Sequence, residues 1–260
     1  MEDIISKDGI KKHLKNSDAY NITILNTVSS TNAHLKETAF SDNEGNVIIA
    51  LSQTSGRGRF SRIFHSPEGC GIYMSILLKP KMPAENAVLI TAAAACAVAE
   101  ASEKLSGKKA DIKWVNDVLI ENKKICGILT EGSIDVNSGN LNWVVLGIGI
   151  NAYKPKDGYP EEIKDIAGAV FDEEKEDLRN QLTASVLDVF WDYYISLKDK
   201  TFLDSYKNRS IVLGKQISVI KNDIFLPAKA LELNDNCQLL VEYKTGEREY
   251  LSSGEISIKL

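Results

Sequence analysis

A short basic loop holds the densest group of side chains that could do chemistry. Arg57, Arg59 and Arg62 lie within six residues and are interspersed with Gly56 and Gly58. Guanidinium groups neutralise carboxylate and phosphate oxygens, and glycines let backbone amides come close to such oxygens. An acid and a triphosphate repel each other, so a reaction that joins them needs this neutralisation. The loop predicts a site for such a reaction, but its composition also fits a flexible, solvated basic hairpin.

Four other blocks could contribute to the same site, and each also has a plain structural interpretation. Ser29–Asn32 precedes a predicted helix and could simply cap it. Lys113–Asp117 contains turn-forming residues between two predicted strands. Lys123–Glu131 is an apolar strand headed by lysines, which usually extend to water. Val145–Asn151 is a strand whose glycines indicate close approach of a ligand or of another backbone.

The order of these blocks along the chain is more specific than any one of them. Together they resemble the motifs of biotin protein ligases, and the resemblance extends over nearly the whole chain. Val115 stands where that family usually has proline. The blocks are SSTN at 29–32, SGRGR at 55–59, KWVND at 113–117, KICGILTE at 124–131, GIGIN at 147–151 and SGEIS at 253–257.

The resemblance implies an activity. Such a chain activates biotin with ATP to biotinyl-5'-AMP and then transfers biotin to a lysine of a biotin carboxyl carrier protein or carrier domain of a biotin-dependent carboxylase. Mg²⁺ is expected with ATP, and no residue is assigned to a metal. Two alternatives stay open, namely a lipoate or octanoyl ligase or transferase of the same broad fold, and a non-catalytic sensor of biotin or its adenylate. The arginine-rich loop favours biotin, and the retained lysine and arginines favour catalysis.

The resemblance also implies residue roles. Lys124, Arg57 and Arg59 are expected to be catalytic, because an ammonium between the biotin carboxylate and the α-phosphate would neutralise charge in the transition state. Asp117, Gly147 and Gly149 are expected to support the site. The residues expected at biotin are Ser30, Thr31, Asn32, Gln53, Gly56, Arg57, Lys124, Gly127 and Leu129. Those expected at the nucleotide are Arg59, Arg62, Phe64, Asn116 and Asn151, with Phe64 stacking on adenine. The role of His65 stays open, and Cys126 is interpreted as a packing residue.

These residues need a sheet to position them, and β-branched runs predict its strands. The expected fold is α+β, with a mixed β-sheet flanked by helices as in the class II synthetase-like biotin/lipoate ligase fold. The predicted strands are Ile22–Leu25, Val47–Leu51, Ile72–Leu78, Asp111–Trp114, Val118–Ile120, Ile125–Glu131 and Leu141–Ile150. The predicted helices are Thr31–Phe40, Pro83–Leu105 and Asp177 to about Lys207.

The chain is expected to have two domains. Residues 1–209 would form the catalytic domain. Short strands and tight turns beyond Ser210 predict a small SH3-like β-barrel over residues 210–260, which would stay marginal unless docked. About twenty residues precede the first predicted strand, too few for the DNA-binding winged helix of many relatives.

Composition indicates which binding partners and which cellular compartment the protein is expected to have. The 260 residues carry a net charge of −5, which argues against a general affinity for nucleic acids. The four cysteines lie far apart, as is typical of a reduced cytoplasm. The stretch 84–105 is apolar but contains three glutamates and a lysine, so a buried helix is expected and no membrane span. A homodimer is compatible with the resemblance.

Overall fold

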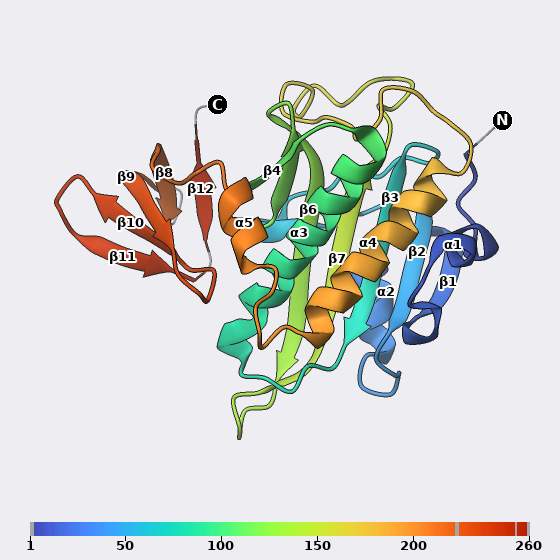
Figure 1. Ribbon diagram of the computed structural model, residues 1–260, viewed down its shortest axis with the longest axis horizontal. Helices are drawn as coiled ribbons and strands as arrows, with labels where there is room; N and C mark the ends of the chain where they lie inside the picture. Colours follow the sequence, from blue (N-terminus) through green and yellow to red (C-terminus); the bar gives the residue numbers. More distant parts are fainter. Residues whose placement is uncertain (1–2, 222–223, 253, 259–260) are drawn as a thin grey trace.

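A seven-stranded mixed sheet forms the centre of the molecule in the computed structural model, which describes residues 3–221, 224–252 and 254–258 (Figure 1). The strands pair in the order β1-β2-β3-β7-β6-β5-β4. β1 runs parallel to β2, and the other neighbours are antiparallel. All seven predicted strands are confirmed. They are β1 (Asn21–Val28), β2 (Asn46–Gln53), β3 (Gly71–Leu78), β4 (Ala110–Lys113), β5 (Asp117–Ile120), β6 (Lys123–Ile134) and β7 (Leu141–Asn151).

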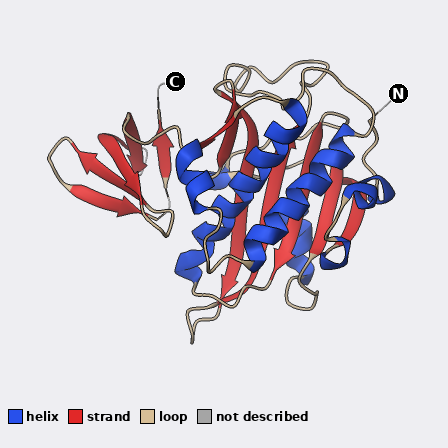
Figure 2. Ribbon diagram, in the orientation of Figure 1, coloured by secondary structure: helices blue, strands red, loops and turns tan. Residues whose placement is uncertain are grey.

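Helices cover both faces of this sheet. α3 (Ala87–Ser106) and α4 (Leu178–Ile195) cross one face, while α2 (Thr31–Thr38) lies on the other (Figures 1 and 2). α1 (Lys7–His13), which the sequence pattern did not predict, packs against α4. The chain also forms α5 (Leu203–Arg209) and three short 3-10 turns. The turns are η1 (Ser17–Ala19), η2 (Arg59–Ser61) and η3 (Ala84–Asn86).

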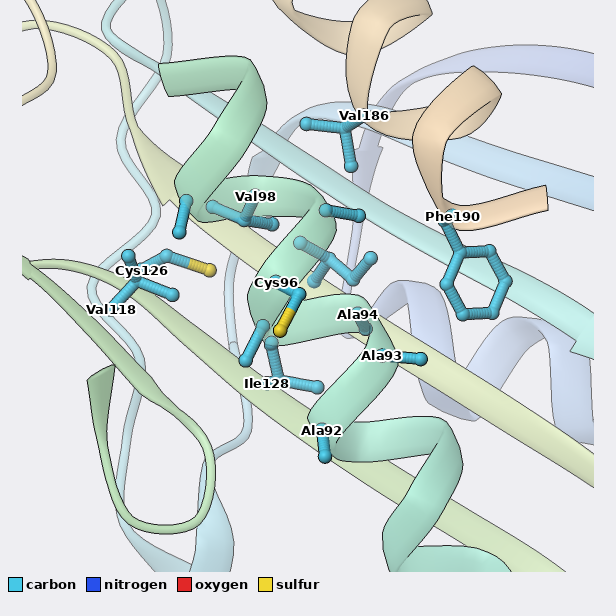
Figure 3. Packing of buried hydrophobic residues seen from close by; sticks show 14 of the residues in the cluster. Ala92, Ala93, Ala94, Cys96, Val98, Val118, Cys126, Ile128, Val186 and Phe190 are labelled. Carbon is cyan, nitrogen blue, oxygen red and sulfur yellow. The ribbon is translucent and has the colours of Figure 1, made fainter. Parts of the chain in front are cut away.

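α3 is the central helix of the core. By length and composition the segment Ala84–Ser106 could cross a membrane, but 67% of its most apolar window is buried inside the protein. Its alanines and Cys96 let it lie close to the sheet, where Val118, Cys126 and Ile128 face it from β5 and β6 (Figure 3). The expected buried helix is therefore confirmed.

The prediction of one helix from Asp177 to about Lys207 is wrong. The chain leaves the helix after Ile195 and re-enters helical geometry only at Leu203. Between them Lys200 adopts a positive φ of 54°, and Phe202 is fully buried. The apolar spacing of the helix continues to Leu197 and is then interrupted by four polar residues before Phe202, a break that the prediction passed over.

The C-terminal segment forms a second, antiparallel sheet, as expected. Its strands pair in the order β11-β10-β9-β8-β12. Val219 and Val241 belong to the same hydrophobic core as the large sheet, and Trp114 Nε1 donates to the Cys237 carbonyl at 2.9 Å. The small sheet is therefore docked, while its closure into an SH3-like barrel and the boundary at 209/210 stay predictions. The strands are β8 (Gln216–Lys221), β9 (Ile224–Leu233), β10 (Leu239–Tyr243), β11 (Arg248–Leu251) and β12 (Glu255–Ser257).

Candidate functional site

The predicted site lies on the face of the large sheet that carries α2. Side chains of a strand alternate between its two faces. Leu146 and Ile148 of β7 belong to the core beneath α3, so Gly147 and Gly149 lie on the opposite face. α2 covers only part of that face, through the small cluster that includes Leu35 and Val145. The uncovered part is the floor of two adjoining cavities.

The first of these, the inner cavity, is small and largely polar. Its volume is about 30 Å³, which is the space of about one water molecule. It contains seven of the nine residues expected at biotin, Gly56 and Lys124 being the exceptions. It is lined by Ser30, Thr31, Asn32, Gln53, Arg57, Phe64, Tyr73, Met74, Gly127, Leu129, Gly147, Ile148 and Gly149.

A connected set of hydrogen bonds fixes the polar groups of the inner cavity. Gln53 Oε1 accepts from the Thr31 backbone amide at 2.9 Å, and its Nε2 donates to Ser66 Oγ at 2.9 Å. Ser75 Oγ lies 2.8 Å from Thr31 Oγ1 and 2.6 Å from Asn32 Oδ1. The segment around Thr31 is held here because Ser30 caps α2, its Oγ accepting from the Ala33 amide at 3.5 Å. The capping interpretation and the pocket interpretation of this segment are therefore compatible.

Phe64 separates the inner cavity from its neighbour. Its ring lies over the paired glycines Gly127 and Gly149, and a Cβ added at Gly149 would lie 2.6 Å from the ring. A Cβ at Gly147 would lie 2.2 Å from Asn32 Oδ1, so this strand needs glycine at both positions. The ring lines both cavities, which places Phe64 at the boundary between the expected biotin and nucleotide sites.

The second cavity, the outer cavity, has a volume of about 250 Å³ and brings the three expected catalytic cations together. Lys124 Nζ lies 2.6 Å from Asp117 Oδ1, which also accepts from Asn116 Nδ2 at 3.1 Å. Arg59 Nη1 donates to Asn116 Oδ1 at 2.9 Å. Arg57 and Arg62 line the same cavity. The cations therefore face one shared space and are not directed to separate regions of solvent.

The remaining expected residues hold the loops of the site. Asn151 Nδ2 donates to the Gly168 carbonyl at 3.0 Å and lies 3.4 Å from the Lys124 carbonyl, so it ties the segment after β7 to β6. The Gly56 carbonyl accepts from the Phe64 amide at 2.9 Å and closes the base of the basic loop. His65 lines the outer cavity.

Several residues in or behind the two cavities were missed by the sequence motifs. Ser75 is fully buried within the apolar strand β3, and this lone polar residue was a signal that could have been used. Tyr159 and Ile166 come from the irregular segment after β7, and Gly254 from the C-terminal sheet. Arg59 Nη2 donates to the Gly254 carbonyl at 2.8 Å. Tyr159 and Ile166 left no local sequence pattern, and Gly254 belongs to the SGEIS block but was given no role at the site, because its approach to Arg59 depends on tertiary structure. Ser253 of the SGEIS block lies outside the described residues.

The ionisation states agree with a cationic site. Burial raises the pKa of Glu131, but hydrogen bonds from Lys36 and Asn32 outweigh it, so the pKa lies below its usual value. Burial raises the pKa of the Cys126 thiol, which keeps it protonated and supports its interpretation as a packing residue. Burial also raises the pKa of Tyr159 to about 12. Within the described ranges, no group of three or more His, Cys, Asp or Glu side chains could hold a metal ion.

Known proteins share the sequence of this region. A profile described as the Biotin/lipoate A/B protein ligase family matches residues 24–151. The Bifunctional ligase/repressor BirA of Bacillus spizizenii is 46% identical over 124 residues, which are 48% of this chain and 38% of that protein. The Biotin--[acetyl-CoA-carboxylase] ligase of Mycobacterium tuberculosis is 31% identical over 157 residues, or 58% of this chain and 55% of the relative. The matches thus span less than two thirds of these curated relatives.

The fold is shared over a longer part of the chain. A structure described as Biotin protein ligase from Aquifex aeolicus in complex with biotin and ATP superposes with a TM-score of 0.74 and 28% identity. The superposition covers 91% of this chain and 97% of that one. The mixed sheet with flanking helices is therefore the fold of that protein.

Proposed function

We propose that this chain belongs to the Biotin/lipoate A/B protein ligase family, whose profile matches residues 24–151, and that it activates biotin with ATP and transfers it to a lysine of a carrier protein. The observation that carries the proposal is the convergence of Lys124, Arg57 and Arg59 on one cavity, beside a small polar cavity on the same sheet floor. The relative in Mycobacterium tuberculosis is named a biotin ligase, and a neighbour of the same fold is described in complex with biotin and ATP. These similarities favour biotin over lipoate.

The inner cavity would take the ring system of biotin. A cyclic urea offers N–H donors and a carbonyl acceptor, which match the hydroxyl and amide groups of Ser30, Thr31 and Asn32. Pockets for small molecules usually enclose about 300–1,000 Å³, whereas this cavity holds about 30 Å³. The Phe64 ring therefore has to move off the glycine floor when biotin enters. Its new position in the outer cavity would let it stack on adenine.

The first step would join the acid to the nucleotide. An oxygen of the biotin carboxylate attacks the α-phosphorus of ATP, the new P–O bond forms, and pyrophosphate leaves. Lys124, which lines the outer cavity beside Gly127, would neutralise the charge that builds on the α-phosphate, and Arg59 and Arg62 would bind the departing phosphates. Asp117 orients the Lys124 ammonium at 2.6 Å. Holding both substrates in line is worth about 7–11 kcal/mol of the barrier.

The second step would transfer the acyl group. The uncharged amine of the acceptor lysine attacks the acyl carbon of biotinyl-5'-AMP, an amide bond forms, AMP leaves with the bonding pair of electrons, and the nitrogen releases one proton to solvent. The basic loop would cover the adenylate and exclude water until the acceptor arrives. The acceptor would be a biotin carboxyl carrier protein or domain, as the names of the curated relatives suggest.

Mg²⁺ would enter with ATP. It prefers oxygen ligands, keeps several waters, and is usually held through phosphates and one or two carboxylates. Asp117 is the carboxylate that lines the outer cavity, and it already binds Lys124. This donor set fits an ion carried by the triphosphate, which would supply further charge neutralisation there.

The decisive experiment supplies the purified protein with biotin, ATP, Mg²⁺ and a carrier domain, and measures the mass of the carrier. We expect the mass increment of one biotinyl group on the carrier. Parallel reactions with lipoate or octanoate in place of biotin test the alternative acids. Adenylate formation without carrier modification would contradict the transfer step. Binding of biotin with no adenylate would instead indicate a sensor.

A further inference from the structure

Glu131 closes the β6 motif, and the proposed reaction gives it no role. Its carboxylate nevertheless receives three groups from different parts of the chain. Lys36 Nζ of α2 lies 2.7 Å from Oε1, Asn32 Nδ2 donates to Oε2 at 2.9 Å, and Arg57 Nη1 of the basic loop lies 3.5 Å from Oε1. One carboxylate thus connects the strand, the helix and the loop that surround the inner cavity.

The contact with Asn32 decides which atom of that amide faces the cavity. Asn32 Nδ2 donates to Glu131 and to the Leu129 carbonyl, so its two N–H groups are both used. The Asn32 Oδ1 atom therefore faces Ser75 and the space above Gly147. The inner cavity therefore presents an acceptor at this point, which suits an N–H group of a cyclic urea.

The contact with Arg57 holds one side of the basic loop. Arg57 lines both cavities, and half of its side chain is exposed, while the loop is also held through Arg59, which donates to Asn116 and to the Gly254 carbonyl. Lys36 lies on the other side and keeps Glu131 in place, its own side chain being 28% exposed. Two cations share one carboxylate, and the cluster keeps a net positive charge that an incoming anion can use.

We propose that Glu131 is a positioning residue that docks Arg57, and with it the basic loop, over the inner cavity and fixes the amide of Asn32 before the acid binds. The proposal rests on the proposed function for the identity of the acid. Because the loop is already ordered, less conformational entropy is lost when the acid binds, and the free energy of binding is more favourable. Loss of the contact should therefore weaken acid binding and loop closure and leave the chemical step unaltered.

The test compares Glu131→Gln with the wild type, with Glu131→Asp and with Glu37→Gln. The glutamine variant keeps the shape and removes the charge, the aspartate variant keeps the charge at shorter reach, and Glu37 is an exposed carboxylate on α2 that controls for net charge. Two measurements are made on each. One is the rate of trypsin cleavage between residues 57 and 62 in the ligand-free protein. The other is the KM for biotin and the kcat of biotin-dependent pyrophosphate exchange.

For Glu131→Gln we expect cleavage in the loop to be about three- to tenfold faster and KM for biotin about three- to tenfold higher, as for loss of one partly exposed charged contact. The kcat of Glu131→Gln should stay within about twofold of the wild-type value. The cleavage rate and KM of Glu131→Asp should lie between those of the wild type and Glu131→Gln, and Glu37→Gln should match the wild type in both. Unchanged cleavage and KM, or a fall in kcat at constant KM, would overturn the proposal. If the wild type catalyses no exchange, the proposed function fails, and the cleavage rates still report on the Arg57–Glu131 contact.

Discussion

At the scale of single residues, the site depends on where charge is held before any substrate arrives. Lys124 is bound to Asp117, Arg59 to Asn116, and Arg57 to Glu131. Each cation is thereby kept at the wall of the cavities without a bound anion. Anionic substrates would therefore meet cations that already face the cavities, with Asp117 and Glu131 still holding them in place.

Lys124→Ala should leave the fold intact and lower the rate of adenylate formation by about 100- to 1,000-fold, the usual loss when one charge-stabilising donor is removed. Lys123→Ala is the matched control, because that neighbouring lysine is exposed at the strand end. The measurement is pyrophosphate release in a single turnover with biotin and ATP. A near-normal rate would remove Lys124 from its proposed role.

Gly149→Ala should destabilise the protein by about 1–3 kcal/mol, since the added methyl group would overlap the Phe64 ring. In a Phe64→Ala background the same substitution should cost almost nothing. Urea unfolding of the four proteins gives the two differences. An equal penalty in both backgrounds would mean that the methyl group meets something other than the ring.

The sequence motifs predicted well which residues lie together at the site. They predicted the contacts of each residue less well. The GRGR loop, Lys124 and the strand glycines carry unusual residue types, so the sequence alone marks them. The partners of Glu131 and Ser75 became visible only in three dimensions, because they come from other strands and helices. Phe64 was expected at adenine, but its place on the glycine floor depends on the pairing of β6 with β7.

At the scale of elements, a bidentate ion pair joins the end of α3 to α5. Arg209 Nη1 and Nη2 lie 2.6 and 2.8 Å from the two carboxylate oxygens of Glu103, which also accepts from the Ala110 amide of β4. The hydrogen bond from Arg209 lowers the pKa of Glu103 against the opposing effect of burial. The pair thus fixes the corner from which the chain enters the small sheet.

The free energy of unfolding should therefore fall in acid through this contact. A carboxyl whose pKa is lowered on folding stabilises the protein above its unfolded value of 4.5, and this contribution disappears as the pH falls through the lower folded value. Glu103→Gln should cost about 1–2 kcal/mol at pH 7, with the difference from the wild type shrinking below pH 4.5. Urea titrations at several pH values check this, and a difference that does not vary with pH would contradict it.

Strands were more predictable than the connections between helices. Runs rich in β-branched residues mark most strands of the large sheet, because such side chains fit a pleated, half-buried surface. The turn between α4 and α5 was not predicted because its apolar residues, such as Leu197 and Phe202, pack into the same core as the buried face of α4. α1 was not predicted because Ile10 is the one buried residue among its seven, so it shows no helical pattern of apolar residues.

At the scale of the whole molecule, the two sheets share one core and one cavity. The small sheet contributes Gly254 and Ile256 to the outer cavity and receives the indole N–H of Trp114. Nucleotide binding and docking of the small sheet should therefore stabilise each other, because both use the same wall.

Trp114→Phe should destabilise the protein by about 1–3 kcal/mol, because it leaves the buried Cys237 carbonyl without its donor. Trp143→Phe is a matched control, since the buried Nε1 of Trp143 has no hydrogen-bond partner in the part of the chain that the structure describes. Denaturant unfolding of both variants compares the two losses. A larger loss at Trp143 than at Trp114 would show that ring volume, and not the hydrogen bond, holds the small sheet.

The bond from Arg59 to Gly254 spans 195 positions of the chain. Ribosomes deliver these two residues at widely separated times, so a growing polypeptide has its basic loop long before it has the carbonyl that receives it. In a nascent chain stalled before residue 254, Arg59 would therefore have its partner Asn116 but not this carbonyl. Synthesis of the small sheet adds the contact that joins it to the basic loop.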